Sequence, residues 1–192
     1  NGVYQYFCNS FFDTLKVHLY PMRPIILAIE SSCDETSASV ISNGKVLNNI
    51  IATQAVHQKY GGVVPELASR AHQQNILAVV NEAIEKAGIK RTDLTAVAFT
   101  RGPGLMGSLL VGVSFAKAAA ASLGIPVVPV HHLAGHIESI WLQHGNIPLP
   151  AIILVVSGGH TSLYEVRERG VYRLIGRTRD DAAGEAYDKV AR

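Results

Sequence analysis

An approximate internal repeat is the feature of this sequence that most constrains its fold. Residues 25–32 (IILAIESS) and residues 152–159 (IILVVSGG) are each an apolar run that ends in a small polar loop. Each copy continues as a strand pattern, a turn that contains glycine and a second strand pattern. A short apolar run bounded by turn residues is typical of a buried strand. The repeat predicts two similar β units, unless short strands of like composition match here by chance.

The residues around and between the two copies alternate between strand and helix patterns. We expect strands over residues 25–30, 37–41, 46–53, 94–100 and 125–130, with helices over 65–87, 109–123 and from about 131 to before Gly145. This order, β-β-β-α-β-α-β-α, predicts an α/β fold with a mixed sheet. Two lobes that each open with a strand, a phosphate-type loop and a hairpin follow the plan of the actin-like ATPase fold (ASKHA, RNase H-like).

The second copy stops after its opening strands, so we expect unequal domains. Residues 22–150 are assigned to a first lobe with a metal-binding helix, and residues 151–192 to the start of an incomplete second lobe. Each apolar side chain left on an uncovered sheet face forfeits about 1.5–3 kcal/mol. The chain is therefore interpreted as truncated. Residues 1–21 precede the clean pattern that opens at Met22 and are interpreted as an upstream or cloning-derived extension, with a transit peptide as the alternative.

The composition is that of a folded protein with no strong charge preference. Hydrophobic residues make up 48% of the chain, charged residues 17%, and the formal net charge is +2. Any RNA-binding surface must therefore be local or come from a partner. The two cysteines, Cys8 and Cys33, cannot build a disulfide framework, which favours a reduced, cytoplasmic protein. No apolar run is judged to reach the roughly 18 residues that span a bilayer.

Two histidines four residues apart are the clearest candidates for chemistry. On a helix, His132 and His136 would lie one above the other on the same face. Two imidazoles so placed can bind one transition metal with a third ligand from elsewhere, or can be ordinary structural histidines. The zinc peptidase motif needs Glu directly after its first histidine, but Leu133 stands there. The pattern favours a metal site and disfavours that peptidase.

Two loops could bind an anionic ligand. Residues 31–36 (SSCDET) offer hydroxyls and amides to a phosphate, and Asp34 or Glu35 could act as a general base. The alternative is an acidic turn in solvent. Residues 102–108 (GPGLMGS) lead into a helix N-terminus, which favours anions, but lack the Lys-Ser/Thr ending of a P-loop. Their glycines could instead permit close packing.

The loop of the second copy could approach a nucleotide. Residues 157–161 (SGGHT) contain two glycines, which allow the backbone to come close to a ligand or simply to bend. Asp188, on the last predicted helix, could reach a ribose hydroxyl or lie on a solvated helix face.

Together these segments resemble the tRNA N6-adenosine threonylcarbamoyltransferase family (TsaD in bacteria, formerly called O-sialoglycoprotein endopeptidase or glycoprotease), in its N-terminal part. The resemblance runs from Met22 to Arg192. The motifs, in order, are residues 29–36 (IESSCDET), 60–70 (YGGVVPELASR), 102–105 (GPGL), 131–136 (HHLAGH), 156–161 (VSGGHT) and 180–189 (DDAAGEAYDK).

The resemblance implies an actin-like ATPase fold and a transfer reaction. The N6 amine of adenosine 37, in tRNAs that read codons beginning with A, would attack the carbamoyl carbon of threonylcarbamoyl-AMP, and AMP would leave. His132 and His136 would hold one divalent metal, iron or zinc. Asp34 and Glu35 are the candidates for aligning or deprotonating the nucleophile. The residues expected to contact the adenylate are Val155, Val156, Ser157, Gly158, Gly159 and Asp188.

The resemblance also implies partners, and this chain differs from the family in length. The expected partners are tRNA, a paralogous dimerisation subunit (TsaB-like), a small ATPase (TsaE-like) and the adenylate synthase (TsaC-like), with no membrane. Family members continue further and carry another metal-ligand Asp and a nucleotide-contacting Asn in the part missing here. This chain is therefore expected to be inactive alone. The alternatives are a non-catalytic nucleotide-binding or dimerisation paralogue, whose bacterial form lacks the histidine pair, and a metallopeptidase.

Overall fold

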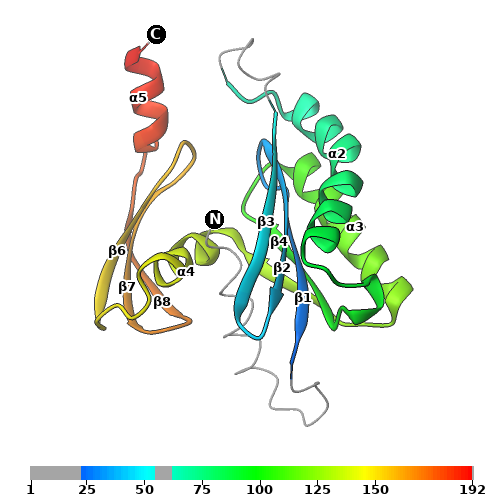
Figure 1. Cartoon of the computed structure of the whole chain (residues 1–192). Helices are drawn as coiled ribbons and strands as arrows, with labels where there is room; N and C mark the ends of the chain where they lie inside the picture. Colours follow the sequence, from blue (N-terminus) through cyan, green and yellow to red (C-terminus); the bar gives the residue numbers. More distant parts are fainter. Residues whose placement is uncertain (1–22, 55–61, 192) are drawn as a thin grey trace.

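The computed structural model of this chain describes residues 23–54 and 62–191, so the expectations for residues 1–21 and for the loop around Tyr60 lie outside the described residues. The order of elements confirms the expected mixed α/β architecture (Figure 1). The elements are β1 (Ile25–Glu30), β2 (Glu35–Ser42), β3 (Lys45–Thr53), α2 (Pro65–Lys86), η2 (Arg91–Asp93), β4 (Ala96–Gly102), α3 (Met106–Leu123), β5 (Val127–His131), α4 (His132–His144), β6 (Ala151–Val156), β7 (Thr161–Glu168), β8 (Val171–Arg177) and α5 (Ala183–Ala191).

The first sheet has five strands in the order β3-β2-β1-β4-β5. Strands β1, β2 and β3 pair antiparallel, whereas β1–β4 and β4–β5 are parallel. The β2–β3 turn is the predicted one: Asn43 has φ 50° and Gly44 has φ 73°, as a two-residue Asn-Gly hairpin requires. Because β1, β4 and β5 run in the same direction, their carboxyl ends meet at one edge of the sheet.

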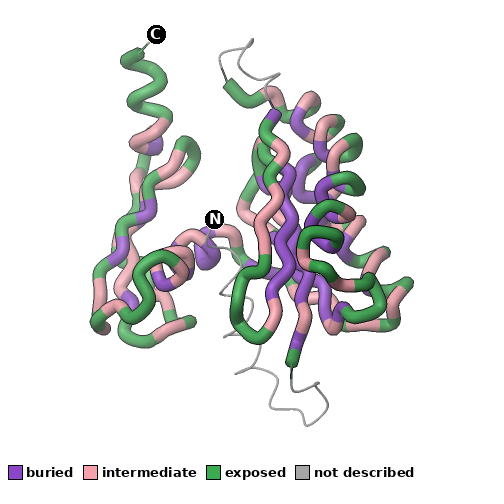
Figure 2. The backbone as a smooth tube through the Cα atoms, viewed as in Figure 1, coloured by how far each residue is buried: buried purple, intermediate pink, exposed green. Residues whose placement is uncertain are grey.

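Both faces of the central strands are buried, which explains their nearly continuous apolar sequence. Helices α2 and α3 lie over one face (Figure 1), where Leu27 and Ile29 pack with Phe99 in the main core. The alternate residues Ile26 and Ala28 point to the other face and are at most 1% exposed. Figure 2 shows this buried centre running through the strands.

Helix α3 corrects the expectation that no apolar segment is long enough to span a bilayer. Its 18 residues, Met106–Leu123, are long and apolar enough to cross a membrane by length and composition alone. In the fold, however, one side of the helix packs against β4 and α2, and Ala116 and Ala120 on that side are almost fully buried. The apolar character of α3 therefore serves helix–sheet packing in this structure.

The second sheet repeats the first three strands of the chain, with the antiparallel order β6-β7-β8. Helix α4 lies between the two sheets in Figure 1 and covers one face of the second sheet, where Ile153 and Val155 pack with Trp141. The alternate side chains of β6 point away: Ile152 and Leu154 are each 61% exposed. The repeat seen in the sequence is thus a structural repeat with one uncovered apolar face.

A partly buried ion pair joins α4 to the second sheet. The Arg169 Nη2 donates to Glu138 Oε2 at 2.7 Å, and the Tyr172 hydroxyl donates to Glu138 Oε1. The Arg169 guanidinium also lies 5.4 Å from the centre of the Trp141 ring. These contacts fix the helix that carries the histidine pair against the sheet that carries the second glycine loop.

Candidate functional site

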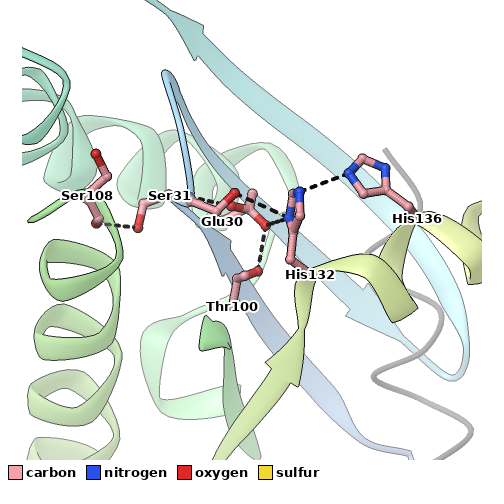
Figure 3. Close-up of polar contacts among 7 residues, drawn as sticks. Glu30, Ser31, Thr100, Ser108, His132 and His136 are labelled. Atoms are coloured by element: carbon pink, nitrogen blue, oxygen red, sulfur yellow. Dashed lines mark hydrogen bonds and ion pairs between the residues drawn. The ribbon is translucent and has the colours of Figure 1, made fainter. Parts of the chain in front are cut away.

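The two histidines of the predicted metal site lie together at the start of α4. His132 is the first residue of the helix, directly after β5, and His136 is one turn further on. Their Nε2 atoms are 3.0 Å apart, and the rings meet edge to face with centroids 4.4 Å apart (Figure 3). The four-residue spacing therefore produces two imidazoles whose nitrogens converge on one point.

This arrangement fits two ligand positions of a transition metal. Zinc–nitrogen bonds are about 2.0–2.1 Å long and zinc sites are tetrahedral, so two such nitrogens lie about 3.3 Å apart, close to the 3.0 Å found here. Burial, together with the neighbouring His132, lowers the pKa of His136 to about 4, so this ring is neutral at pH 7 as a ligand must be. Within residues 23–54 and 62–191 no group of three or more metal-ligating side chains is present, so metal binding by the histidine pair stays a prediction.

Sequence reasoning missed Glu30, which contacts the histidine pair. Its Oε2 lies 3.3 Å from His132 Nδ1 and accepts a hydrogen bond from the Thr100 hydroxyl at 2.6 Å, while the Ser32 backbone N–H donates to Oε1. Burial raises the pKa of Glu30, but the hydrogen bonds and the charge of His132 outweigh it and lower the pKa to about 2. The sequence did contain a signal for this contact. Glu30, Thr100 and His132 lie at or just beyond the carboxyl ends of three parallel strands, and these ends share one edge of the sheet.

The structure places Asp34 and Glu35 at the end of the loop that follows β1, without an ion pair, among the described residues, to the histidines. Asp34 is partly buried, whereas Glu35 is exposed, begins β2 and accepts a hydrogen bond from the Thr53 hydroxyl at 3.4 Å. In the part of the chain that the structure describes, neither carboxylate forms an ion pair with His132 or His136. Their role as general bases stays a prediction.

A fully buried histidine supports this loop from α2. The His72 Nε2 lies 3.0 Å from the Cys33 carbonyl oxygen, and its Nδ1 lies 2.7 Å from the Thr36 hydroxyl. A carbonyl can only accept, so Nε2 carries a proton, and Nδ1 faces the Thr36 hydroxyl, which can either donate or accept. Cys33 lies in the same loop. Partial burial of the Cys33 thiol, together with the neighbouring Asp34, raises the pKa of Cys33 to about 11, which disfavours Cys33 as a nucleophile.

Two glycines, Gly104 in the loop before α3 and Gly112 within α3, permit close packing against residues 31 and 32. A Cβ on Gly104 would lie 2.5 Å from the Ser32 carbonyl oxygen, and a Cβ on Gly112 would lie 2.3 Å from Ser31 Oγ. The Leu105 backbone N–H donates to that same Ser32 oxygen at 2.7 Å. These contacts support the packing interpretation of the loop over the anion-site interpretation.

The loop after β6 lies beside the histidine pair. The His160 ring centroid is 6.4 Å from that of His132. Within the loop, the Ser157 N–H donates to the His160 carbonyl at 2.8 Å and the His160 N–H donates to Ser157 Oγ at 3.0 Å. A Cβ on Gly158 or Gly159 would meet no atom within 4 Å, so the backbone there is open to a ligand.

The predicted adenylate residues differ in their exposure. Val155 is 7% exposed and packs under α4, so only its backbone is available to a ligand, whereas Val156 is exposed. Asp188 is exposed on α5, one turn beyond Gly184. The Gly184 N–H donates to the Ser157 carbonyl at 3.3 Å, so the start of α5 sits on the glycine loop. Adenylate contact by these residues stays a prediction.

Replacing Gly184 by alanine is expected to detach α5 from this loop. The new Cβ would lie 2.8 Å from both the Gly158 nitrogen and the Ser157 oxygen, which are backbone atoms that cannot rotate away. Overpacking of this kind costs about 1–3 kcal/mol. Urea denaturation should show the loss, while Gly159→Ala, where space is open, should leave stability unchanged. Equal stability of the two variants would contradict the close approach.

Comparisons with known proteins agree with the sequence resemblance. The model of the family described as tRNA N6-adenosine threonylcarbamoyltransferase matches residues 45–192. The protein of that name from Moorella thermoacetica is 59% identical over 169 residues, which are 87% of this chain and 49% of that protein. The one from Clostridioides difficile is 56% identical over 170 residues, which are 88% of this chain and 50% of that protein. The chain thus spans about half the length of the curated relatives it matches.

A solved structure supports the fold. The structure described as YeaZ from Pseudomonas aeruginosa matches with a TM-score of 0.57 at 22% identity, covering 80% of this chain and 65% of that one. A second Pseudomonas aeruginosa structure, described as similar to peptidase YEAZ, matches with a TM-score of 0.56 at 23% identity, covering 80% of this chain and 64% of that one. At these identities the likeness concerns the fold alone.

Proposed function

The chain belongs to the tRNA N6-adenosine threonylcarbamoyltransferase family, and on this premise we propose that it forms the metal- and adenylate-binding part of such a transferase. The reaction moves the threonylcarbamoyl group from threonylcarbamoyl-AMP to N6 of adenosine 37 in tRNAs that read codons beginning with A, and releases AMP. The observation that carries the proposal is the convergence of two imidazoles beside an open glycine loop.

Each residue has a role in this proposal. His132 and His136 hold one iron or zinc ion, which when bound supplies positive charge that stabilises the oxygens of the acyl group. The open backbone of Gly158 and Gly159 receives the adenylate, with Asp188 directed to its ribose. Asp34 and Glu35 align or deprotonate the N6 amine, a role that rests on the family resemblance.

The geometry disfavours the metallopeptidase alternative. A general base must reach the water that attacks the substrate. The acidic residue nearest the pair in sequence, Glu138, is 1% exposed and is held by Arg169 and Tyr172 on the side of α4 that faces the second sheet. The carboxylate that contacts the pair, Glu30, meets His132 at Nδ1 and not at the Nε2 atom that faces His136. The presence of the pair also argues against a non-catalytic dimerisation paralogue. The proposed partners remain tRNA, TsaB-like, TsaE-like and TsaC-like proteins, in the cytoplasm.

A chimera tests the proposed activity. Residues 22–192 of this chain replace the matching half of the Moorella thermoacetica relative, and tRNA is assayed for the modified base with threonylcarbamoyl-AMP as donor. We expect the chimera to modify tRNA and the chain of 192 residues alone to give no product above background. An inactive chimera with normal stability would argue against the proposed activity, and product formed by the chain alone would contradict the expected inactivity.

A further inference from the structure

We propose that Glu30 is a positioning residue, whose carboxylate holds His132 in one orientation and one tautomer so that Nε2 faces His136. This inference rests on the proposed function, because it concerns how the chain prepares the pair for a metal. It adds a residue from β1 to a site for which the sequence named two ligands, both on α4.

The contacts of Glu30 identify it as an ionised acceptor. Its two oxygens face three donors: the Ser32 backbone N–H on Oε1, and the Thr100 hydroxyl and His132 Nδ1 on Oε2 (Figure 3). A carboxylate has no proton to donate, so it suits a set of neighbours that all donate. The Glu30 side chain is 14% exposed and that of His132 is 19% exposed, which limits competition from water.

This acceptor determines the tautomer of His132. Two oxygens lie near His132 Nδ1, the Glu30 Oε2 at 3.3 Å and the Ser32 hydroxyl at 3.2 Å. The ionised carboxylate can only accept and the hydroxyl can also accept, so a proton on Nδ1 satisfies both contacts, whereas a bare Nδ1 would leave its lone pair facing the carboxylate. In the neutral ring, Nε2 then has a free electron pair. That atom is the one that lies 3.0 Å from His136 Nε2. Without a metal, a proton on His136 Nε2 can occupy the space between the two nitrogens, and a cation can replace it.

The same contact restricts the orientation of the ring. His132 is the first residue of α4, where no preceding turn of helix confines its side chain. Glu30 is itself held by Thr100 and Ser32, so the acceptor is fixed by strand β4 and by the loop that follows β1. Carboxylates that hold ligand histidines in this way commonly raise metal affinity about 10- to 100-fold.

The test is Glu30→Gln in the whole chain, with two readouts. Long-range proton–nitrogen NMR correlations of the histidine rings report the tautomer without any metal, at a pH where the free rings are neutral. The wild type should show His132 protonated on Nδ1, and the variant should gain the form protonated on Nε2. Titration with Co²⁺ as the probe, followed by its visible absorption, should give a Kd that is about 10- to 100-fold higher in the variant.

The matched control is Glu138→Gln, which removes a buried carboxylate on the helix that carries His132 but has no contact with His132. This control should lose stability but keep the His132 tautomer and a Co²⁺ Kd within about twofold of wild type. The inference is overturned if the tautomer is the same in wild type and Glu30→Gln, or if both variants weaken Co²⁺ binding equally. Absence of Co²⁺ binding in the wild type would count against the proposed metal role, while the NMR comparison would still decide the role of Glu30.

Discussion

Replacing Arg169 by methionine is expected to lower the free energy of unfolding by about 3–5 kcal/mol, because it leaves the buried Glu138 carboxylate without its cation. The Glu138 side chain is 2% exposed, whereas that of Arg169 is 31% exposed. The more exposed partner is therefore the one whose loss costs more. Glu138→Gln should cost only about 1–3 kcal/mol, because the guanidinium that remains can turn toward water.

The measurement is urea denaturation followed by tryptophan fluorescence. Trp141 is the single tryptophan of the chain and packs in the same cluster, so its emission reports this region directly. The double variant, Arg169→Met with Glu138→Gln, should lose less stability than the sum of the single variants, because neither charge then remains unpaired. A loss below about 1 kcal/mol for Arg169→Met would show that α4 does not depend on this ion pair.

Local signals in the sequence predicted much of the fold. Pro65 marked the start of α2 and Asn43-Gly44 marked the first hairpin, because these residues restrict the backbone by themselves. The start of β2 was placed too late. Glu35 and Thr36 are polar, but they join the strand because Glu35 pairs with Thr53 of β3. That pairing depends on a partner strand and is not visible in the polarity of the segment.

The candidate site likewise contains a local contact that the sequence predicted and long-range contacts that it did not. The His132–His136 contact follows from helical spacing within five residues, so the sequence predicted it. The contact of Glu30 with His132 crosses 102 positions of the chain and arises only when β1, β4 and β5 lie side by side. The buried His72 was likewise missed, because its partners Thr36 and Cys33 come from a different element. Residues held by sheet topology need the strand order, which local patterns do not supply.

Replacing both His132 and His136 by alanine is expected to abolish stoichiometric metal binding. The two Nε2 atoms lie 3.0 Å apart, and the described residues offer no group of three metal-ligating side chains elsewhere or at this pair. A site that loses two of its ligands retains too few donors to compete with water for zinc or iron. Metal content should be measured by mass spectrometry after the protein is equilibrated with Zn²⁺ and dialysed.

Background binding by other imidazoles is the main competing explanation, because the chain has eight histidines. The control is therefore His131→Ala with His144→Ala, which removes two exposed imidazoles from either end of the same helix. That variant should keep the metal content of the wild type. If both double variants lose metal to the same extent, the binding is nonspecific. If neither loses metal, the pair is structural, and the transferase mechanism must place its cation elsewhere.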